Sequence, residues 1–173
     1  MDSLLVITIV AQDRPGLVES IAAAVARHGG NWLESRMSRL GGQFAGILRA
    51  EVPAEQVENL RNEFRQLEKA GLHITVRADE SAPATPAGRI AELALLGQDR
   101  PGIIRQISEA FARSQVNVEE LETECTSAPM SGETLFNARA RVQIPPSCDM
   151  AELRAELEKI ATDLMVDVSL REV

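Results

Sequence analysis

Gln12-Asp13-Arg14-Pro15-Gly16 is repeated letter for letter as Gln98-Asp99-Arg100-Pro101-Gly102, a shift of 86 positions. The likeness continues beyond the pentapeptide, with 11 identical residues over the 23 positions from 12 to 34. From Phe44 onward the shift is 92, so the second copy holds six additional residues, which fall in the loop-like segment 127–132. The chain is therefore an internal duplication of a unit of about 80 residues.

The hydrophobic spacing changes in the same order within each copy. Short apolar or alternating runs predict strands at residues 4–10, 31–40, 43–52 and 72–78 in the first copy, and at 90–96, 117–126, 135–144 and 165–171 in the second. Apolar residues three or four apart predict a helix after the first strand of each copy and a second helix before the last. Each copy thus has the order βαββαβ.

This order predicts an α+β protein with two tandem ferredoxin-like domains. A single four-stranded antiparallel sheet with both helices on one face is the economical arrangement, because both apolar helix stripes need the same cover. Residues between the copies are rich in Ala, Pro, Thr and Ser, as linkers are. We therefore expect an N-terminal domain over residues 1–79, a linker over 80–88 and a C-terminal domain over 89–173.

Composition and charge favour a globular protein that binds neither nucleic acid nor membranes directly. Hydrophobic residues make up 45% of the chain and charged residues 25%, which is ordinary for a globular protein with a packed core. Four Phe, one Trp and no Tyr give little material for stacking on bases, and the net charge of −8 repels phosphate. The sequence shows no basic leader and no apolar stretch of membrane-spanning length, so a cytoplasmic protein is expected.

No pattern in the sequence predicts an enzyme, a metal or a cofactor. Cys125 and Cys148 have neither the CxxC spacing nor the neighbouring histidines of a zinc site. His28 and His73 lie 45 positions apart, and neither stands in a nucleophile or metal-ligand motif. Nucleophile elbows, phosphate loops and dinucleotide fingerprints are also absent from the sequence.

The repeated pentapeptide has features of a strand-to-helix turn and features of an anion site. Asp13 and Asp99 are expected to accept hydrogen bonds from first-turn amides, and the prolines preset φ for the helix. Gly16 and Gly102 leave the amides open, as a carboxylate ligand requires. A well-formed turn without a ligand explains the same residues, so both interpretations stay open.

Asn31 and Asn117 each follow the aspartate of their own copy by 18 positions. A turn hydrogen bond or a left-handed conformation explains an asparagine after a helix, but the equal spacing also suits a contact with an amino or carboxylate group. Arg27, Arg113, Glu34 and Glu120 are expected to be solvated surface charges.

Both copies resemble the ACT domain. The resemblance rests on Arg-Pro-Gly after the first strand of a βαββαβ unit, and on Gly29-Gly30-Asn31 before the second strand. It covers nearly the whole chain, and pairs of such domains without an attached enzyme are typical of bacterial regulators of the glycine cleavage genes. The second copy departs from the pattern, because Gln115-Val116 replaces the two glycines and its hairpin is longer.

The resemblance implies a regulator without catalytic activity that binds a small amino acid, glycine above all, between paired domains of a homodimer. It implies a protein partner, a separate DNA-binding transcriptional activator of those genes. The implied ligand contacts are Asp13, Gly16, Leu17 and Asn31 in the first copy and Asp99, Gly102, Ile103 and Asn117 in the second.

Three other interpretations compete with this one. Acylphosphatases share the βαββαβ order, but their phosphate-binding loop is richer in glycine, and Asp13 would repel phosphate. RNA-recognition modules also share the order, but they need aromatic platforms and a basic face. An ACT pair that regulates or assembles an amino-acid metabolic enzyme, with no role in transcription, fits the sequence equally well.

Overall fold

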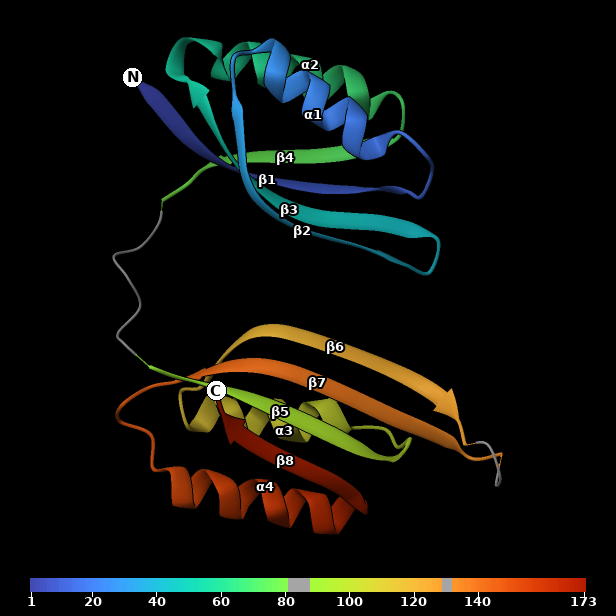
Figure 1. The fold of residues 1–173 in the computed structure, drawn as a ribbon. Coiled ribbons are helices and arrows are strands. Elements are labelled where there is room, and N and C mark those ends of the chain that lie inside the picture. The colour runs from blue at the N-terminus through green and yellow to red at the C-terminus, as the bar shows by residue number, and fades with distance from the viewer. Residues whose placement is uncertain (81–87, 129–131) are drawn as a thin grey trace. The chain divides into compact units, whose positions relative to one another are not determined.

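The computed structural model describes residues 1–80, 88–128 and 132–173 and divides into two compact units, Met1–Ser81 and Ala82–Val173 (Figure 1). The predicted linker over residues 80–88 lies almost entirely outside the described residues, so its boundaries stay a prediction. Among the described residues, no helix combines the length and apolar character needed to cross a bilayer.

The N-terminal unit has the predicted βαββαβ order. Its elements are β1 (Asp2–Gln12), α1 (Leu17–Arg27), β2 (Asn31–Leu40), β3 (Gln43–Pro53), the 3-10 turn η1 (Ala54–Gln56), α2 (Val57–Glu68) and β4 (Leu72–Ala78). The four strands form an antiparallel sheet in the order β2-β3-β1-β4, and both helices cover one face of it (Figure 1).

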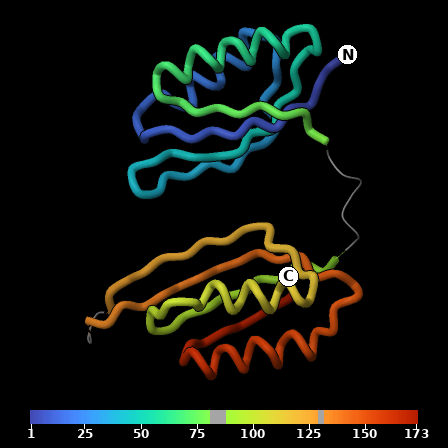
Figure 2. The backbone as a smooth tube through the Cα atoms, turned by 180° about the vertical axis from the view of Figure 1, so that it is seen from behind, coloured from blue at the N-terminus to red at the C-terminus, as the bar shows by residue number. Residues whose placement is uncertain are grey.

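The C-terminal unit repeats this arrangement. Its elements are β5 (Arg89–Gln98), α3 (Ile103–Arg113), β6 (Asn117–Ser127), β7 (Thr134–Ile144), α4 (Met150–Leu164) and β8 (Val166–Glu172). The sheet order is β6-β7-β5-β8, again with both helices on one face (Figure 2). Of the predicted six-residue loop insertion, Ser127 belongs to β6, and residues 129–131 lie outside the described residues.

Each unit has an aliphatic core between its sheet and its helices, as the scarcity of aromatic residues requires. Alternate residues of the two central strands point toward the helices, and apolar residues at helical spacing meet them. The largest fully buried side chains of the N-terminal core include Phe64, Leu5, Ile7, Ile9 and Ile21. The fold class predicted from the sequence is confirmed.

The duplication extends to an irregularity in the sheet. In the N-terminal sheet the pairing of β2 with β3 shifts between Trp32 and Glu34, and in the C-terminal sheet that of β6 with β7 shifts between Val118 and Glu120. Such a bulge bends the strand and increases its twist. The sequence repeat is therefore a repeat of backbone geometry as well.

Candidate functional site

The two pentapeptides adopt the same backbone geometry. Each connects the first strand of its domain to the first helix, and each ends in a left-handed glycine, Gly16 with φ 89° and Gly102 with φ 93°. The Asp13 amide donates to the Gly42 carbonyl at 2.9 Å, and the Asp99 amide donates to the Thr134 carbonyl at 2.9 Å. These bonds place each loop beside the hairpin turn of its own domain.

The expectation that Asp13 and Asp99 cap the helices is wrong. The residue at the capping position is Gly16 in one domain and Gly102 in the other, and no side chain accepts a hydrogen bond from the first turn of either helix. The Asp13 carboxylate instead forms an ion pair with Arg39, with 2.6 Å between Oδ2 and Nε. Without a side-chain cap, the first-turn amides remain available to an anion.

Leu17 and Ile103 point into the cores and are only 4% and 2% exposed. A ligand at either loop can therefore meet these residues only through their backbone. The glycine before each of them exposes the helix end, because a Cβ built on Gly16 or on Gly102 would meet no atom within 4 Å. The open space predicted beside both glycines is present.

The arginine of each pentapeptide supports its loop. The Arg14 Nη2 donates to the carbonyl of Ala70 at 2.8 Å, in the turn before β4. Arg100 reaches the corresponding turn before β8, where its Nη2 lies 4.0 Å from the Met165 sulfur. The sequence pattern alone predicts no structural role for these arginines, and their identical position in both copies is the signal that could reveal one.

Asn31 and Asn117 lie at the other end of their sheets. Asn31 begins β2 and pairs with Glu51, which itself pairs with Leu4 in β1. Asp13 follows nine residues further along the chain, which corresponds to about 30 Å along an extended strand. Asn117 is placed in the same way, because it pairs with Gln143 and that residue pairs with Ile90.

Within one domain the structure therefore brings together three of the four expected contacts. These are Asp13, Gly16 and Leu17 in the N-terminal domain and Asp99, Gly102 and Ile103 in the C-terminal domain. A ligand at these loops can meet an asparagine at the start of β2 or β6 only if another domain supplies it. Ligand binding by all eight residues stays a prediction.

The charges that were expected to be solvated are exposed, and three of them also form ion pairs. Arg27 in α1 binds Glu63 in α2, and Arg113 in α3 binds Glu156 in α4, so the same helix-to-helix contact occurs in both domains. Glu34 pairs with Arg49 at 2.9 Å. The hydrogen bonds that Arg49 donates to Glu34 and to Asp79 raise the pKa of Arg49. These pairs stabilise each domain rather than form a reactive site.

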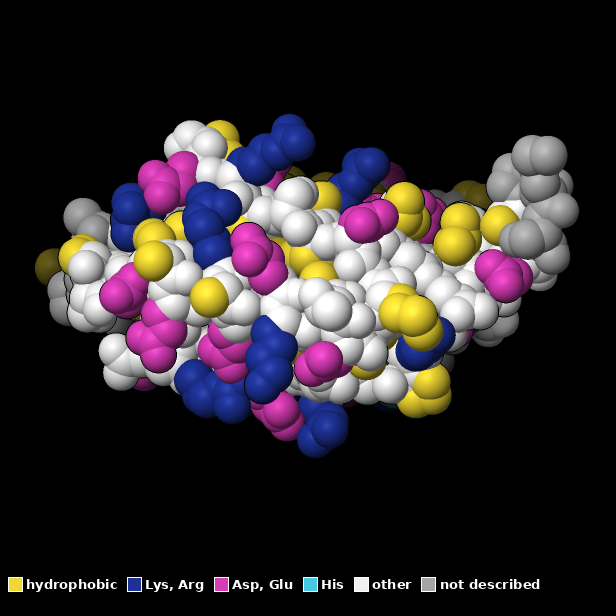
Figure 3. All heavy atoms as spheres, turned by 90° about the horizontal axis from the view of Figure 1, so that it is seen from below, with side chains coloured by type: hydrophobic (Ala, Val, Ile, Leu, Met, Phe, Trp, Pro, Cys, Tyr) yellow, Lys and Arg dark blue, Asp and Glu magenta, His cyan; other side chains and the backbone are white. Residues whose placement is uncertain are grey.

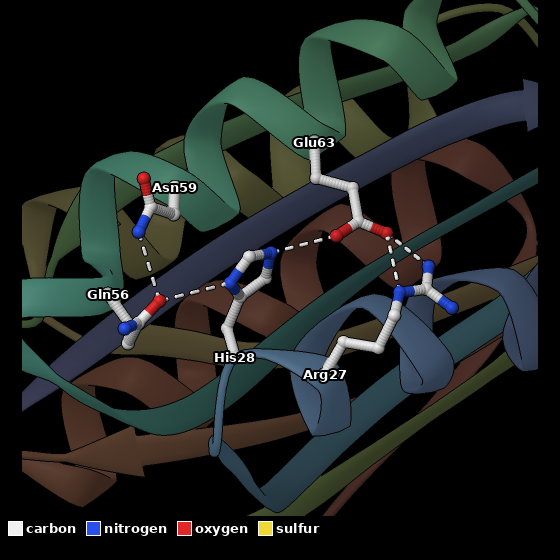
Figure 4. Close-up of polar contacts among 5 residues, drawn as sticks. All are labelled: Arg27, His28, Gln56, Asn59 and Glu63. Atoms are coloured by element: carbon white, nitrogen blue, oxygen red, sulfur yellow. Dashed lines mark hydrogen bonds and ion pairs between the residues drawn. The ribbon is translucent and has the colours of Figure 1, made fainter.

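The N-terminal domain extends its helix-to-helix pair into a network (Figure 4). His28 Nε2 lies 2.8 Å from Glu63 Oε2, and His28 Nδ1 lies 3.3 Å from Gln56 Oε1. The hydrogen bond from Arg27, helped by the one with His28, lowers the pKa of Glu63. Ser114 stands where His28 stands, so the C-terminal domain lacks the imidazole.

An open cavity of about 790 Å³ lies in the C-terminal domain beside the end of α3 and the start of α4. Its lining includes Arg113, Cys148, Glu152 and Lys159, and burial raises the pKa of the Cys148 thiol. None of the predicted contact residues lines this cavity. Across the described part of the chain, no group of His, Cys, Asp and Glu residues is arranged to hold a metal ion.

Comparisons with known proteins point to one family. Residues 3–77 match the family described as the ACT domain. The chain is 24% identical over 171 residues to the glycine cleavage system transcriptional repressor of Escherichia coli, a match that covers 98% of this chain and 90% of the repressor. The repressor of Shigella flexneri matches equally well.

Two solved structures share the fold over the full length. A protein of unknown function from Galdieria sulphuraria is 31% identical, with a TM-score of 0.88 and coverage of 100% of this chain and 99% of that one. A structure provisionally named as a glycine cleavage system transcriptional repressor is 20% identical, with a TM-score of 0.70 and coverage of 100% and 98%. At that identity the second likeness shows the fold alone.

Proposed function

This chain belongs to the ACT-domain family, and we propose that it is a non-catalytic regulator that senses a small amino acid through its two duplicated loops. The observation that carries the proposal is the pair of uncapped helix starts behind left-handed glycines, present in both domains with the same geometry. A helix start with free amides attracts the carboxylate that every free amino acid carries.

Glycine is the proposed ligand. Full-length similarity to glycine cleavage system transcriptional repressors supports this choice. The ligand carboxylate would lie at the amides around Gly16 and Leu17 or around Gly102 and Ile103. Asp13 or Asp99 would meet its ammonium group, together with Asn31 or Asn117 from another copy in a homodimer.

The regulator is proposed to act on transcription in the cytoplasm through a separate DNA-binding activator of the glycine cleavage genes. Its net charge of −8 opposes direct binding to phosphate backbones. On the face of the C-terminal domain that carries α3 and α4, basic side chains are interspersed with acidic ones and form no continuous basic patch in this view (Figure 3). A protein partner is therefore needed to connect the sensor to DNA.

Calorimetry of the purified chain with glycine, alanine and serine tests the sensing step. Saturable binding of glycine, weakened by Asp13→Asn or Asp99→Asn in a protein with unchanged circular dichroism, is the expected result. No heat of binding with any of the three amino acids would contradict the proposal.

A mobility-shift assay on a glycine cleavage promoter tests the transcriptional step. The chain alone should shift nothing at physiological salt, and it should alter the shift produced by the activator. If affinity capture instead returned a metabolic enzyme whose activity the chain changes, the role would be that of a regulatory or assembly subunit.

A further inference from the structure

The two domains differ in the residue that follows their first helix. His28 follows α1 and Ser114 follows α3, and their backbone angles are similar, with φ −95° and ψ 20° at His28 and φ −85° and ψ 6° at Ser114. Both side chains therefore leave the backbone in the same direction. Serine lacks the imidazole ring, so the C-terminal domain has space where the N-terminal domain has that ring.

The second helices of the two domains correspond residue by residue at a shift of 93 positions. Arg61 in α2 and Arg154 in α4 each donate from Nη1 to a carbonyl of the last strand of their domain, at 3.0 and 2.7 Å. Glu63 and Glu156 each pair through Oε1 with the arginine that ends the first helix, and their side chains are 24% and 26% exposed. The surface of α2 that faces His28 is thus repeated in α4.

In the N-terminal domain an imidazole ring lies against this surface (Figure 4). The His28 Nε2 lies 2.8 Å from Glu63 Oε2, the Nδ1 lies 3.3 Å from Gln56 Oε1, and the side chain is only 17% exposed. Within the described part of the C-terminal domain, Glu156 bonds Arg113 through Oε1 and no side chain reaches its Oε2. The second copy therefore keeps the carboxylate that binds the ring but supplies no ring of its own.

The open cavity of about 790 Å³ in the C-terminal domain lies at this position. Three of its lining residues stand where the N-terminal network has His28, Gln56 and Glu63, and they are Ser114, Asp149 and Glu156. The volume is in the range of small-molecule sites and exceeds that of a single ring. Acidic side chains in the lining outnumber basic ones by three to two, which favours a ring that donates N–H groups or carries a positive charge.

We propose that this cavity binds a small molecule through an imidazole ring, which takes the place that the His28 ring has in the N-terminal domain. A ring N–H donates to Glu156 Oε2, and Asp149 presents a carboxylate oxygen to the second ring nitrogen. Lys159 in α4 also lines the cavity, and its ammonium group binds a carboxylate of the same molecule. The ligand class is thus a small imidazole compound with a carboxylate, such as free histidine.

Imidazole alone tests the ring contact. It carries no carboxylate, so its binding is independent of the loops of the proposed function. Titration of the full chain, followed by NMR, should give saturable shifts of the amide signals around Ser114 and Glu156. Thiazole, a ring of the same size without an N–H group, should bind about tenfold more weakly or worse. Ser114→His should abolish imidazole binding by filling the cavity with its own ring, whereas the matched Ser114→Ala should retain it.

Two further variants test the site without filling it. Glu156→Gln should weaken imidazole binding about tenfold or more, because the ring loses a charged acceptor. His28→Ser should create a second imidazole site in the N-terminal domain, with shifts around Glu63. The proposal would be overturned by a lack of saturable shifts, by shifts confined to other surfaces, by binding that persists in folded Ser114→His, by indifference to Glu156→Gln, or by a folded His28→Ser that gains no site.

Competition with imidazole tests the carboxylate contact. Imidazoleacetate and methylimidazole carry the same ring and differ in the carboxylate, so the first should displace imidazole at a concentration about 1.5- to 5-fold lower than the second. Lys159→Ala should remove this difference, and equal displacement in the unchanged chain would overturn the role of Lys159. Imidazole binding without glycine binding would confirm the cavity site and contradict the sensing proposed for the loops, whereas glycine binding alone would do the reverse.

Discussion

Gln115 adopts the left-handed conformation that Gly29 adopts 86 positions earlier, with φ values of 54° and 66°. Both residues follow the end of the first helix of their domain. Their amides make the same bond, from Gly29 to the Ala26 carbonyl at 3.0 Å and from Gln115 to the Ala112 carbonyl at 3.1 Å. The second copy therefore keeps the turn of the first copy, although glutamine disfavours the left-handed conformation that the turn requires.

Exchanging these two residues should change stability in opposite directions. A non-glycine residue in the left-handed region costs about 1–2 kcal/mol, partly offset by the greater chain entropy of glycine. Gln115→Gly should therefore raise the free energy of unfolding by about 0.5–1 kcal/mol. Gly29→Gln should lower it by a similar amount, because a Cβ at Gly29 would meet Pro53 only at an ordinary 3.6 Å. Urea unfolding of each variant measures both changes, and a destabilised Gln115→Gly would contradict the account.

The neighbouring position behaves differently. A Cβ on Gly30 would lie 2.9 Å from Val25 Cγ1 and 3.0 Å from Val52 Cγ2, so Gly30→Ala should be more destabilising than Gly29→Ala. In the C-terminal domain the equivalent residue is Val116, which is buried. The departure from Gly29-Gly30 in the second copy is thus a local repacking that leaves the loop geometry intact.

Gly16→Ala and Gly102→Ala should each lower the free energy of unfolding by about 1 kcal/mol through backbone strain alone. No atom lies within 4 Å of the added Cβ at either site, and the two φ values are nearly equal, so the two losses should be similar. Asparagine, which tolerates this conformation, should cost less than alanine at both positions. Thermal unfolding measures these losses. Gly16→Val is unsuitable for testing ligand binding, because a β-branched residue is strained at this φ and a loss of stability would resemble a loss of binding.

The Glu63 network should make the N-terminal domain sensitive to acid. A carboxyl whose pKa is lowered in the folded state stabilises the fold above its unfolded value of about 4.3, and this contribution is lost as the pH falls through the folded pKa. Glu63→Gln should therefore lower the free energy of unfolding by about 1 kcal/mol at pH 7, and by progressively less below about pH 4. Urea unfolding curves of the variant and of the unchanged protein at several pH values measure this difference in the free energy of unfolding.

Glu156→Gln is the matched control for this change. Glu156 accepts from Arg113, but Ser114 replaces the histidine that also bonds Glu63. At pH 7, Glu156→Gln should lower the free energy of unfolding by less than Glu63→Gln does. Equal losses would mean that His28 contributes nothing to the network.

The fold could be predicted from the sequence because the hydrophobic periods of strands and helices are local, and the duplication shows them twice. Residue pairs far apart in the sequence carry no such signal. The Arg39 partner of Asp13 lies 26 positions away, beyond α1, and the Ala70 partner of Arg14 lies 56 positions away, so neither could be inferred from spacing. The equal spacing of Asp13 and Asn31 in both copies suggests a shared site. That spacing includes the whole of α1, and this helix carries the chain to the far end of the sheet.

The ion pair between Asp13 and Arg39 makes the two proposed ligand sites unequal and gives the last prediction. If Asp13 receives the ammonium group of glycine, the ligand must compete with the Arg39 guanidinium, which lies 2.6 Å from the same carboxylate. An ion pair as exposed as this one contributes about 0.2–1 kcal/mol, so Arg39→Ala should raise glycine affinity at the N-terminal loop by roughly 1.5- to 5-fold. Among the described residues, no ion pair of this kind involves Asp99, whose site should be unaffected. Calorimetry of Arg39→Ala in an Asp99→Asn background isolates the N-terminal loop, and an affinity that stays unchanged or falls would remove Asp13 from the set of ligand contacts.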